Sequence, residues 1–162
     1  MIHAAKPFFD IIPLTPQNIF AMNNIFIQSV NNSYGYFPDF FKKKLIKQHS
    51  VPHLLKAYIS PKSYILLARQ KNQWLGYCIA RQSIDEPSSL LWLYVKPETR
   101  GSGLGASLVR QVQSKTTANG ISSLQLVTHD QEDFFMSQGF QVVRRVPGLL
   151  AGVDMSVMEW SS

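Results

Sequence analysis

Cysteine is almost missing from this sequence, in which Cys78 is the single example among 162 residues. One cysteine cannot form an internal disulfide or a zinc or iron–sulfur site of several cysteines, so neither holds this fold together. A signal peptide is not expected either, because Asp10 and Pro13 interrupt the apolar segment that could serve as its core. The sequence therefore predicts a cytoplasmic protein.

Long apolar runs are also missing, since none approaches the roughly 18 residues that span a bilayer. Charged residues make up only 16% of the chain, against about 25% in an average soluble domain. Hydrophobic residues nevertheless reach 45%, which is enough to bury a core and excludes a disordered chain. We therefore expect a single globular domain over residues 1–162, with no membrane-spanning segment.

Metal-binding side chains are few and scattered. Of the four histidines, only His49 and His53 share the i,i+4 spacing that puts two side chains on one face of a helix. A zinc site needs a third protein ligand, and none lies near this pair. We therefore predict no metal site.

Positive charge is present and concentrated in one stretch. The net charge is +6, yet residues 40–84 hold nine basic residues and no acid. The nine are Lys42, Lys43, Lys44, Lys47, Lys56, Lys62, Arg69, Lys71 and Arg81. Such a stretch attracts polyanions, and it is also typical of a solvated helix face. We favour the solvated face, because no nucleic-acid-binding motif surrounds these residues and aromatic residues do not alternate regularly with arginine.

Hydrophobic periodicity and turn residues predict the order of the elements. The predicted strands cover residues 8–14, 63–69, 74–81, 88–95, 122–128, 141–145 and 152–160. The predicted helices cover residues 16–30, 39–59 with a pause near 50–52, 104–118 and 131–137. Thr15 is expected to cap the first helix, with Pro16 in its first turn, and Asp39 to cap the second. Pro147 and Gly148 are expected to form the last turn.

This order predicts an α/β fold, with one mixed sheet and helices on both faces. Strands 63–69 and 74–81 are separated by a polar connection of hairpin length, so they are expected to pair antiparallel. Strand 88–95 is apolar on both faces, as expected of a central strand that helices cover on each side. Its alternation puts Leu91, Leu93 and Val95 on one face and Leu90, Trp92 and Tyr94 on the other.

The most informative segment is the glycine-rich turn between strand 88–95 and the helix that follows it. The turn has the sequence Arg100-Gly101-Ser102-Gly103-Leu104-Gly105. Glycines let the backbone approach an anion closely, and the free N–H groups of a helix's first turn add positive potential at the same place. The segment therefore suits a bound pyrophosphate.

Two common nucleotide-binding motifs do not match this turn. The dinucleotide fingerprint G-x-G-x-x-G needs a glycine where Ala106 stands and an acid about 20 residues later, whereas the next acid is Asp130. The P-loop needs Gly-Lys-Ser or Gly-Lys-Thr after its glycines, and neither is present. Both nucleotide-binding folds are therefore excluded.

Together with its neighbours, the turn resembles the acetyl-CoA motif of the GNAT superfamily of N-acetyltransferases. That motif is Arg or Gln, two residues, Gly, one residue, then Gly or Ala, and it follows a strand of the form Leu-x-Val-x-Pro, which matches residues 93–97. Residues 134–140 resemble the family's closing signature, aromatic–aromatic-x-x-x-Gly-Phe. The resemblance implies a GNAT-like, mostly antiparallel sheet of six to seven strands, and acetyl-CoA as the acetyl donor.

The same resemblance implies a cofactor site. Backbone N–H groups of residues 101–106 would hold the pyrophosphate, the pantetheine arm would pair with the strand edge at residues 93–95, and a strand N–H would polarise the thioester carbonyl. The implied cofactor-binding residues are Leu93, Tyr94, Val95, Arg100, Gly101, Ser102, Gly103, Leu104, Gly105, Ala106, Thr128, Phe134 and Phe135.

Three positions depart from the family pattern. The second aromatic of the closing signature, often a tyrosine that acts as general acid, is Phe135. The family's common Asn near the end of the preceding strand is Thr128, and its frequent acid early in the fourth strand is Ser89. Since Phe135 has no proton to donate, the candidate substitutes are Tyr94, His129 and Glu86. Tyr94 and His129 are the predicted catalytic residues, histidine being the residue type whose ordinary pKa suits a base.

The first two helices and their connection are expected to wall the acceptor site. They contribute Tyr34, Tyr36, Phe37 and Phe40, which predict an acceptor with a flat or apolar portion next to its primary amine. The predicted acceptor is a small molecule, or a protein N-terminus or lysine. Two alternatives stay open, namely an RNA-borne amine that uses the basic stretch and a CoA-binding regulatory domain that has lost catalysis. The resemblance leaves a monomer or a homodimer open.

Overall fold

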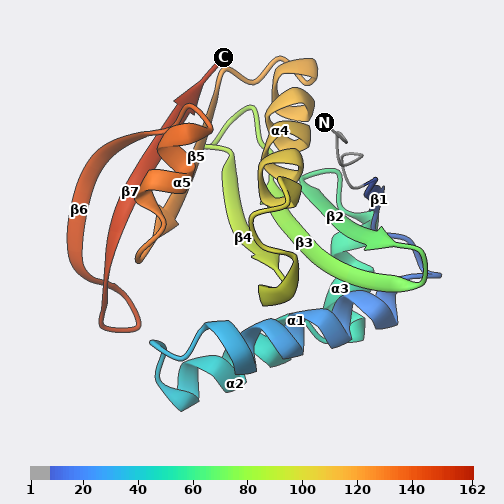
Figure 1. Ribbon diagram of the computed structural model, residues 1–162. Coiled ribbons are helices and arrows are strands. Elements are labelled where there is room, and N and C mark those ends of the chain that lie inside the picture. Colours follow the sequence, from blue (N-terminus) through green and yellow to red (C-terminus); the bar gives the residue numbers. More distant parts are fainter. Residues whose placement is uncertain (1–7) are drawn as a thin grey trace, which may run out of the picture.

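The computed structural model describes residues 8–162 as one twisted sheet with helices packed against it (Figure 1). The strands are β1 (Asp10–Pro13), β2 (Ser63–Gln70), β3 (Gln73–Arg81), β4 (Ser89–Val95), β5 (Ser123–Thr128), β6 (Gln141–Leu150) and β7 (Val153–Ser161). The helices are α1 (Ile19–Ser33), α2 (Asp39–Gln48), α3 (Val51–Ile59), α4 (Leu104–Ala118) and α5 (Glu132–Ser137), and a 3-10 turn, η1 (Pro97–Thr99), precedes the glycine-rich turn. Within the described residues, no helix combines the length and apolar character needed to cross a bilayer.

The seven strands follow the order β1-β2-β3-β4-β5-β7-β6 across the sheet. Every neighbouring pair is antiparallel except β4 and β5, which are parallel. The predicted mixed, mostly antiparallel sheet is therefore confirmed. The last strand of the chain, β7, lies between β5 and β6 and is not an edge of the sheet.

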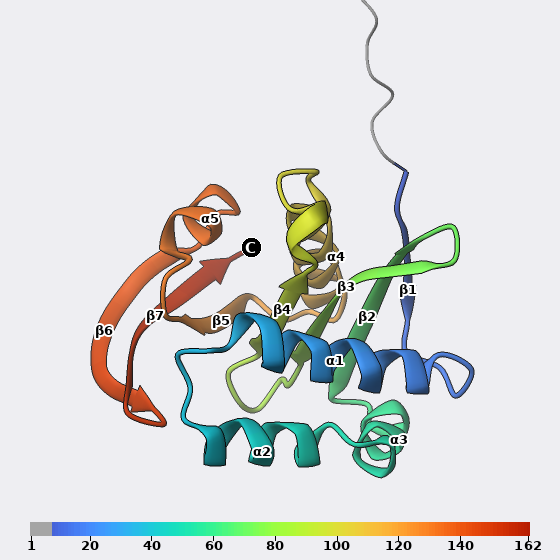
Figure 2. The ribbon, with the colours of Figure 1, turned by 60° about the horizontal axis from the view of Figure 1, so that its bottom comes forward.

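Helices cover both faces of the sheet, as predicted (Figure 2). On one face, α1, α2 and α3 bury a core in which Phe26 from α1 packs against Tyr77 from β3. On the other face, α4 and α5 bury a second core, with Leu108 from α4 and Leu124 from β5 fully enclosed. The strands between these two cores are apolar on both sides for this reason.

A β-bulge in β4 changes which face its first residues point to. Ile79 of β3 pairs with Trp92, but the next residue, Ala80, pairs with Leu90, so Leu91 is an extra residue on β4. The bulge reverses the alternation at that point. Leu90 consequently lies in the core under α4, whereas Trp92 faces α1, and the prediction that these two share a face is wrong.

β4 and β5 are joined at one end only. Ser89 pairs with Gln125, and the Gln125 N–H donates to the Ser88 carbonyl over 2.8 Å. Beyond this point the strands diverge, which is visible in Figure 1. The sheet is therefore split along the facing edges of β4 and β5.

Both ends of α1 differ from the prediction. The helix begins at Ile19, because the Asn18 side chain forms a tight turn before it: its Oδ1 accepts the Thr15 N–H over 2.8 Å and its Nδ2 donates to the Pro13 carbonyl over 3.0 Å. Asn side chains commonly stabilise such turns. Thr15 is therefore not the cap of this helix, and the helix continues to Ser33 instead of ending near Asn31.

Asp39 is the first residue of α2 and not its cap. Pro38 precedes the helix with an extended backbone, and no side chain caps the first turn. The Asp39 carboxylate instead lies 2.9 Å from the Lys42 ammonium one turn later. The carboxylate still lies at the helix N-terminus, where negative charge is favourable.

The final hairpin is longer than predicted. β6 extends to Leu150, and the turn lies at Ala151 and Gly152, both of which have positive φ. Pro147 and Gly148 lie inside β6 in a break of its register with β7, where the Gly148 N–H donates to Asp154 Oδ1 over 2.8 Å. Pro147 has no N–H to donate, which explains the irregular pairing at this point.

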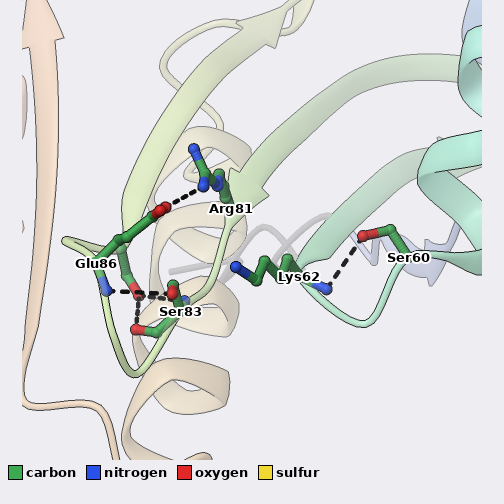
Figure 3. A network of polar contacts seen from close by, with 6 residues as sticks. Ser60, Lys62, Arg81, Ser83 and Glu86 are labelled. Carbon is green, nitrogen blue, oxygen red and sulfur yellow. Dashed lines mark hydrogen bonds and ion pairs between the residues drawn. The ribbon is translucent and has the colours of Figure 1, made fainter.

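Polar contacts hold the loop between β3 and β4 (Figure 3). The Ser83 and Ser88 side chains bond to backbone groups across the loop, and the Arg81 guanidinium pairs with the Glu86 carboxylate. Glu86 is thus engaged in an ion pair and does not line the cavity described below. It is removed from the candidate catalytic residues.

Cys78 is a core residue, as its apolar strand predicts. Its side chain is fully buried, and burial raises the pKa of the thiol to about 12. Since the thiolate is the reactive form, this cysteine is inert at neutral pH.

His49 links the stability of the fold to pH. Its ring stacks on Phe26 at a centroid distance of 3.8 Å, and its Nδ1 lies 2.8 Å from the Leu45 carbonyl. Burial lowers the pKa of His49 below its ordinary value of 6.5, so the folded state favours the neutral ring. The unfolded state takes up a proton on this histidine more readily than the folded state does. The free energy of unfolding is therefore unaffected by His49 protonation above pH 6.5 and decreases as the pH falls below that value. We expect the denaturant midpoint to fall between pH 7.5 and pH 5.5, and His49→Gln to make this fall smaller; an equal fall in both proteins would contradict the prediction.

Candidate active site

The split between β4 and β5 opens into a cavity of about 1070 Å³. Leu91 and Val127 line it from the two facing strands and are 47% and 42% exposed there. From the residues predicted by sequence, the cavity brings together Leu93, Tyr94, Val95, Arg100, Gly101, Gly103, Leu104, Gly105, Ala106, Thr128, His129, Phe134 and Phe135. Segments that are distant in the sequence therefore line one space.

Ser102 is the predicted cofactor residue that lies elsewhere. It lines a second cavity of about 930 Å³, between α1, the β2–β3 turn and the segment that leads into α4. Its Oγ is buried without a hydrogen-bond partner, which is true of no other side-chain N or O atom in residues 8–162. The Ser102 side chain thus points away from the larger cavity, and only its backbone is left to take part in the predicted site.

The glycine-rich turn presents backbone N–H groups at the start of α4. Gly101 and Gly103 have φ of +77° and +88°, values that side chains disfavour. The first bond of the helix joins the Ser107 N–H to the Gly103 carbonyl at 3.0 Å. The N–H groups of residues 104–106 therefore have no partner within the helix, and with the helix dipole they form a site suited to an anion.

Gly105 allows α4, α5 and the end of β4 to approach one another. A Cβ added at Gly105 would lie 3.3 Å from Cζ of Phe134 and 3.7 Å from Cγ2 of Val95. Only glycine, or alanine with a small shift, suits this position, which agrees with the motif. Phe134 thereby closes one side of the cavity next to the first turn of α4.

Arg100 bends back onto the protein. Its Nε donates to the Val95 carbonyl over 3.1 Å, and its Nη2 donates to Ser33 Oγ over 3.2 Å. The side chain thus joins the glycine-rich turn to the end of β4 and to the end of α1. Sequence reasoning missed Ser33, because the contact joins residues that are 67 positions apart.

One edge of β4 points its backbone groups into the cavity. The Val95 carbonyl accepts from Arg100, so it is directed away from β3. In a strand, the N–H and C=O groups of residues i and i+2 point to the same side. Leu93 therefore directs its N–H and C=O toward the split, in the orientation needed to bind an extended ligand as an added strand.

Phe135 and Thr128 have structural roles. The Phe135 ring is buried against Phe140 at a centroid distance of 5.8 Å and an angle of 72°. Thr128 Oγ1 accepts the Gln131 N–H over 3.1 Å at the start of α5. The closing signature thus positions α5 but supplies no acid at Phe135.

Tyr94 provides a protonated hydroxyl next to the cavity. Its side chain faces α1 and is 4% exposed. Burial raises the pKa of Tyr94 above its ordinary value of 10, while the charge of Arg100 acts in the opposite direction. The phenol therefore remains protonated at neutral pH and can donate a proton or a hydrogen bond.

The rings of His129 and Tyr36, which both line the cavity, are in contact. Their ring centroids are 4.6 Å apart at an angle of 31°, and burial raises the pKa of Tyr36 above its usual range. His129 Nδ1 lies 3.2 Å from the Asp154 carbonyl. Because a carbonyl only accepts, Nδ1 is the nitrogen that carries a proton in this contact, and in the neutral ring Nε2 is then the nitrogen with the lone pair.

Aromatic side chains wall the other half of the cavity. Tyr34, Tyr36 and Phe37 line it, and they are joined by Trp92, whose ring lies 5.3 Å from that of Tyr34. Phe40 is 70% exposed on α2 and lies outside the cavity, so its predicted place there is wrong. Trp92 was missed because the sequence predicted this wall only from the first two helices and their connection, whereas Trp92 lies on β4.

The basic stretch lies away from the cavity. None of its nine basic residues lines the cavity in the described part of the chain. Three of them form ion pairs with acids, Lys42 with Asp39, Arg69 with Asp10 and Arg81 with Glu86. This placement agrees with a solvated surface.

Comparison with family models matches residues 61–142 to the acetyltransferase (GNAT) domain. The matched region contains β4, the glycine-rich turn and α5. The matched region is preceded by α1, α2, α3 and the α1–α2 connection, and this connection carries Tyr34, Tyr36 and Phe37 of the aromatic wall.

Curated and solved proteins are similar to this chain. Mouse N-alpha-acetyltransferase 80 is 34% identical over 77 residues, which are 46% of this chain and 24% of that protein. The chain thus spans about a quarter of that relative. PaiA N-acetyltransferase of Thermoplasma acidophilum, solved with coenzyme A, superposes with a TM-score of 0.79 at 21% identity, covering 96% of this chain and 99% of that one. The ribosomal-protein-S18-alanine N-acetyltransferase of Escherichia coli superposes with a TM-score of 0.71 at 16% identity, covering 95% and 94%.

Proposed function

Since this chain belongs to the GNAT family of acetyltransferases, we propose that it transfers the acetyl group of acetyl-CoA to a small primary amine. The amine nitrogen would attack the thioester carbonyl directly. The observation that carries the proposal is the shared cavity, in which the free edge of β4 and the open first turn of α4 lie side by side. We propose further that residues 1–162 act as a single domain in this reaction.

The cofactor's phosphates and its extended arm need different partners, and the cavity offers both. The N–H groups of residues 104–106 would hold the pyrophosphate, and the backbone of Leu93 would pair with the pantetheine arm. Acetyl-CoA supplies an activated thioester to this site. The Leu93 N–H, held rigidly in β4, would bind the thioester oxygen as negative charge develops on it.

Two side chains would move protons. His129 Nε2, whose lone pair is left free by the Nδ1 contact with Asp154, would accept the proton that the attacking amine loses. Tyr94, protonated at neutral pH, would donate to the departing thiolate. Tyr94 would thus replace the acid that Phe135 lacks.

The acceptor half of the cavity favours a small amine with a flat or apolar portion. Its wall consists of Tyr34, Tyr36, Phe37 and Trp92. The contact of Tyr36 with His129 joins the α1–α2 connection to the end of β5 and bounds this half of the cavity. A compact arylalkylamine fits a space bounded in this way more readily than a folded protein surface does.

Two measurements test this function. Acetyl-CoA and CoA are expected to raise the thermal midpoint, while NAD and ATP leave it unchanged. Thiol release should then be seen with arylalkylamines such as 2-phenylethylamine, faster than with a peptide N-terminus, and it should change little between low and physiological salt. No shift with either CoA species overturns the proposal; a shift without acetyl transfer to any amine would support a regulatory CoA-binding domain instead.

Tyr36→Ala is expected to raise KM for 2-phenylethylamine about threefold to tenfold, the effect of losing one aromatic contact. The KM for acetyl-CoA should not change, because Tyr36 lies in the acceptor half. Phe40→Ala is the matched control, since this aromatic residue of the same region lies outside the cavity. An unchanged KM for the amine in Tyr36→Ala would contradict the aromatic wall.

A further inference from the structure

Three hydroxyl groups form a buried chain that leads to the cavity. Ser29 Oγ lies 2.7 Å from the Phe26 carbonyl oxygen and 2.7 Å from Tyr77 Oη. Tyr77 Oη in turn lies 3.3 Å from Tyr34 Oη. Ser29 and Tyr77 are fully buried, and Tyr34, which is 7% exposed, is the member that lines the cavity.

The direction of this chain follows from counting protons, because each hydroxyl has one. The Phe26 carbonyl can only accept, so the Ser29 proton is directed to it. Ser29 must then accept from Tyr77, and Tyr77 must accept from Tyr34. All three protons point inward, and the Tyr34 oxygen keeps only lone pairs for any further partner.

We infer that Tyr34 orients the amine of the acceptor by accepting one of its N–H groups, an inference that rests on the proposed function. A primary amine has two N–H groups and one lone pair, and the lone pair must face the thioester carbon. An N–H group that gives up its water partners on entering the cavity needs an acceptor there. Tyr34 and His129 Nε2 are acceptors of the two N–H groups, and together they fix the direction of the lone pair.

The proton balance of the reaction agrees with this division. The amine nitrogen bonds to the acetyl carbon, the bond from that carbon to sulfur breaks, and one N–H proton passes to His129. The second N–H stays on the amide product, and this is the one that Tyr34 holds. The hydroxyl chain moves no proton, because it ends on a carbonyl; Tyr77 and Ser29 are positioning residues that keep the Tyr34 oxygen an acceptor.

A secondary amine has a single N–H, which it loses in the reaction, so it has no second N–H for Tyr34 to accept. Comparing primary and secondary amines therefore distinguishes hydrogen bonding by Tyr34 from packing by its ring. In the wild type, 2-phenylethylamine and its N-methyl derivative are compared by kcat/KM. Tyr34→Phe is expected to lower kcat/KM about tenfold for the primary amine and less than about twofold for the N-methyl amine. The preference for the primary amine should therefore nearly disappear.

Two further variants complete the test. Tyr77→Phe removes the acceptor of the Tyr34 proton and should also reduce the preference for the primary amine, whereas Tyr58→Phe, on the exposed side of α3, should leave it unchanged. Thermal melting of each variant verifies folding. If Tyr34→Phe lowers kcat/KM equally for both amines, the inference is overturned and the proposed function remains intact. Failure of the wild type to acetylate any primary amine overturns the proposed function, and this inference with it.

Discussion

Replacing Gly76 with alanine is expected to lower the free energy of unfolding by about 1 to 3 kcal/mol, the usual range for overpacking a dense core. A Cβ at Gly76 would lie 2.5 Å from the carbonyl oxygen of Tyr94 and 3.4 Å from Cα of Val95. Both neighbours are backbone atoms of β4, which cannot rotate aside as a side chain can. The strand itself must move.

The movement of β4 should reach the proposed cofactor site. Leu93 and Val95 border the split, and Arg100 holds the glycine-rich turn to the Val95 carbonyl. We expect Gly76→Ala to weaken acetyl-CoA binding about tenfold, since the strand edge and the start of α4 lose their alignment. Calorimetric titration with acetyl-CoA and urea unfolding measure the two effects.

Gly35→Ala is the matched control for this substitution. Gly35 has no atom within 4 Å of an added Cβ and no positive φ, so alanine should leave both the stability and the cofactor affinity near the wild-type values. If Gly76→Ala were as stable as Gly35→Ala and bound acetyl-CoA equally well, the close approach of β3 and β4 would have no energetic consequence.

Local sequence signals predicted the glycine-rich turn and the elements on either side of it, which line the cavity. Three glycines, the strand before them and the helix after them are adjacent in the sequence, and their spacing specifies the turn. The hairpin of β2 and β3 and the start of α4 at Leu104 were predicted for the same reason. These features depend on residues a few positions apart, where pattern and propensity act directly.

Features that depend on distant residues could not be predicted. The bulge at Leu91 arises from pairing with β3, and alternation along β4 alone assigns Leu90 to the wrong face. α1 begins at Ile19 and not at residue 16 as predicted, because the Asn18 side chain bonds to Pro13 and Thr15 and this turn competes with helix formation. Each error follows from a contact that the one-dimensional pattern does not contain.

The aromatic wall of the cavity, which is proposed to bind the acceptor, also depends on contacts between distant residues. Phe37 lines the cavity and Phe40 does not, although both are aromatic residues near the start of α2. The pairing of Tyr36 with His129 joins residues from opposite walls, and the hydroxyl chain from Ser29 to Tyr34 joins α1 with β3 and the loop after α1. Such juxtapositions depend on how the helices cross the sheet.

Replacing Tyr94 with phenylalanine is expected to lower kcat about a hundredfold, the usual loss when a general acid is removed. The proposed role of Tyr94 is to protonate the thiolate that leaves, so the substitution acts on the reaction and not on binding. The KM for acetyl-CoA should therefore stay within about twofold of the wild type, because uniform binding is unchanged. Steady-state thiol release, with acetyl-CoA and the amine varied in turn, separates the two constants.

The raised pKa of Tyr94 and a control substitution at Tyr64 make this test decisive. Burial raises its pKa above 10, so the hydroxyl is protonated throughout the range from pH 6 to pH 9 and the defect of Tyr94→Phe should be constant across that range. Tyr64→Phe is the control, since Tyr64 lies on β2 near Lys115, away from the cavity, and loses an equivalent hydroxyl. A rise in the KM for acetyl-CoA with an unchanged kcat would instead assign Tyr94 to binding. The thiolate would then leave without an acid at this position, which the low basicity of a thiolate relative to an alkoxide allows.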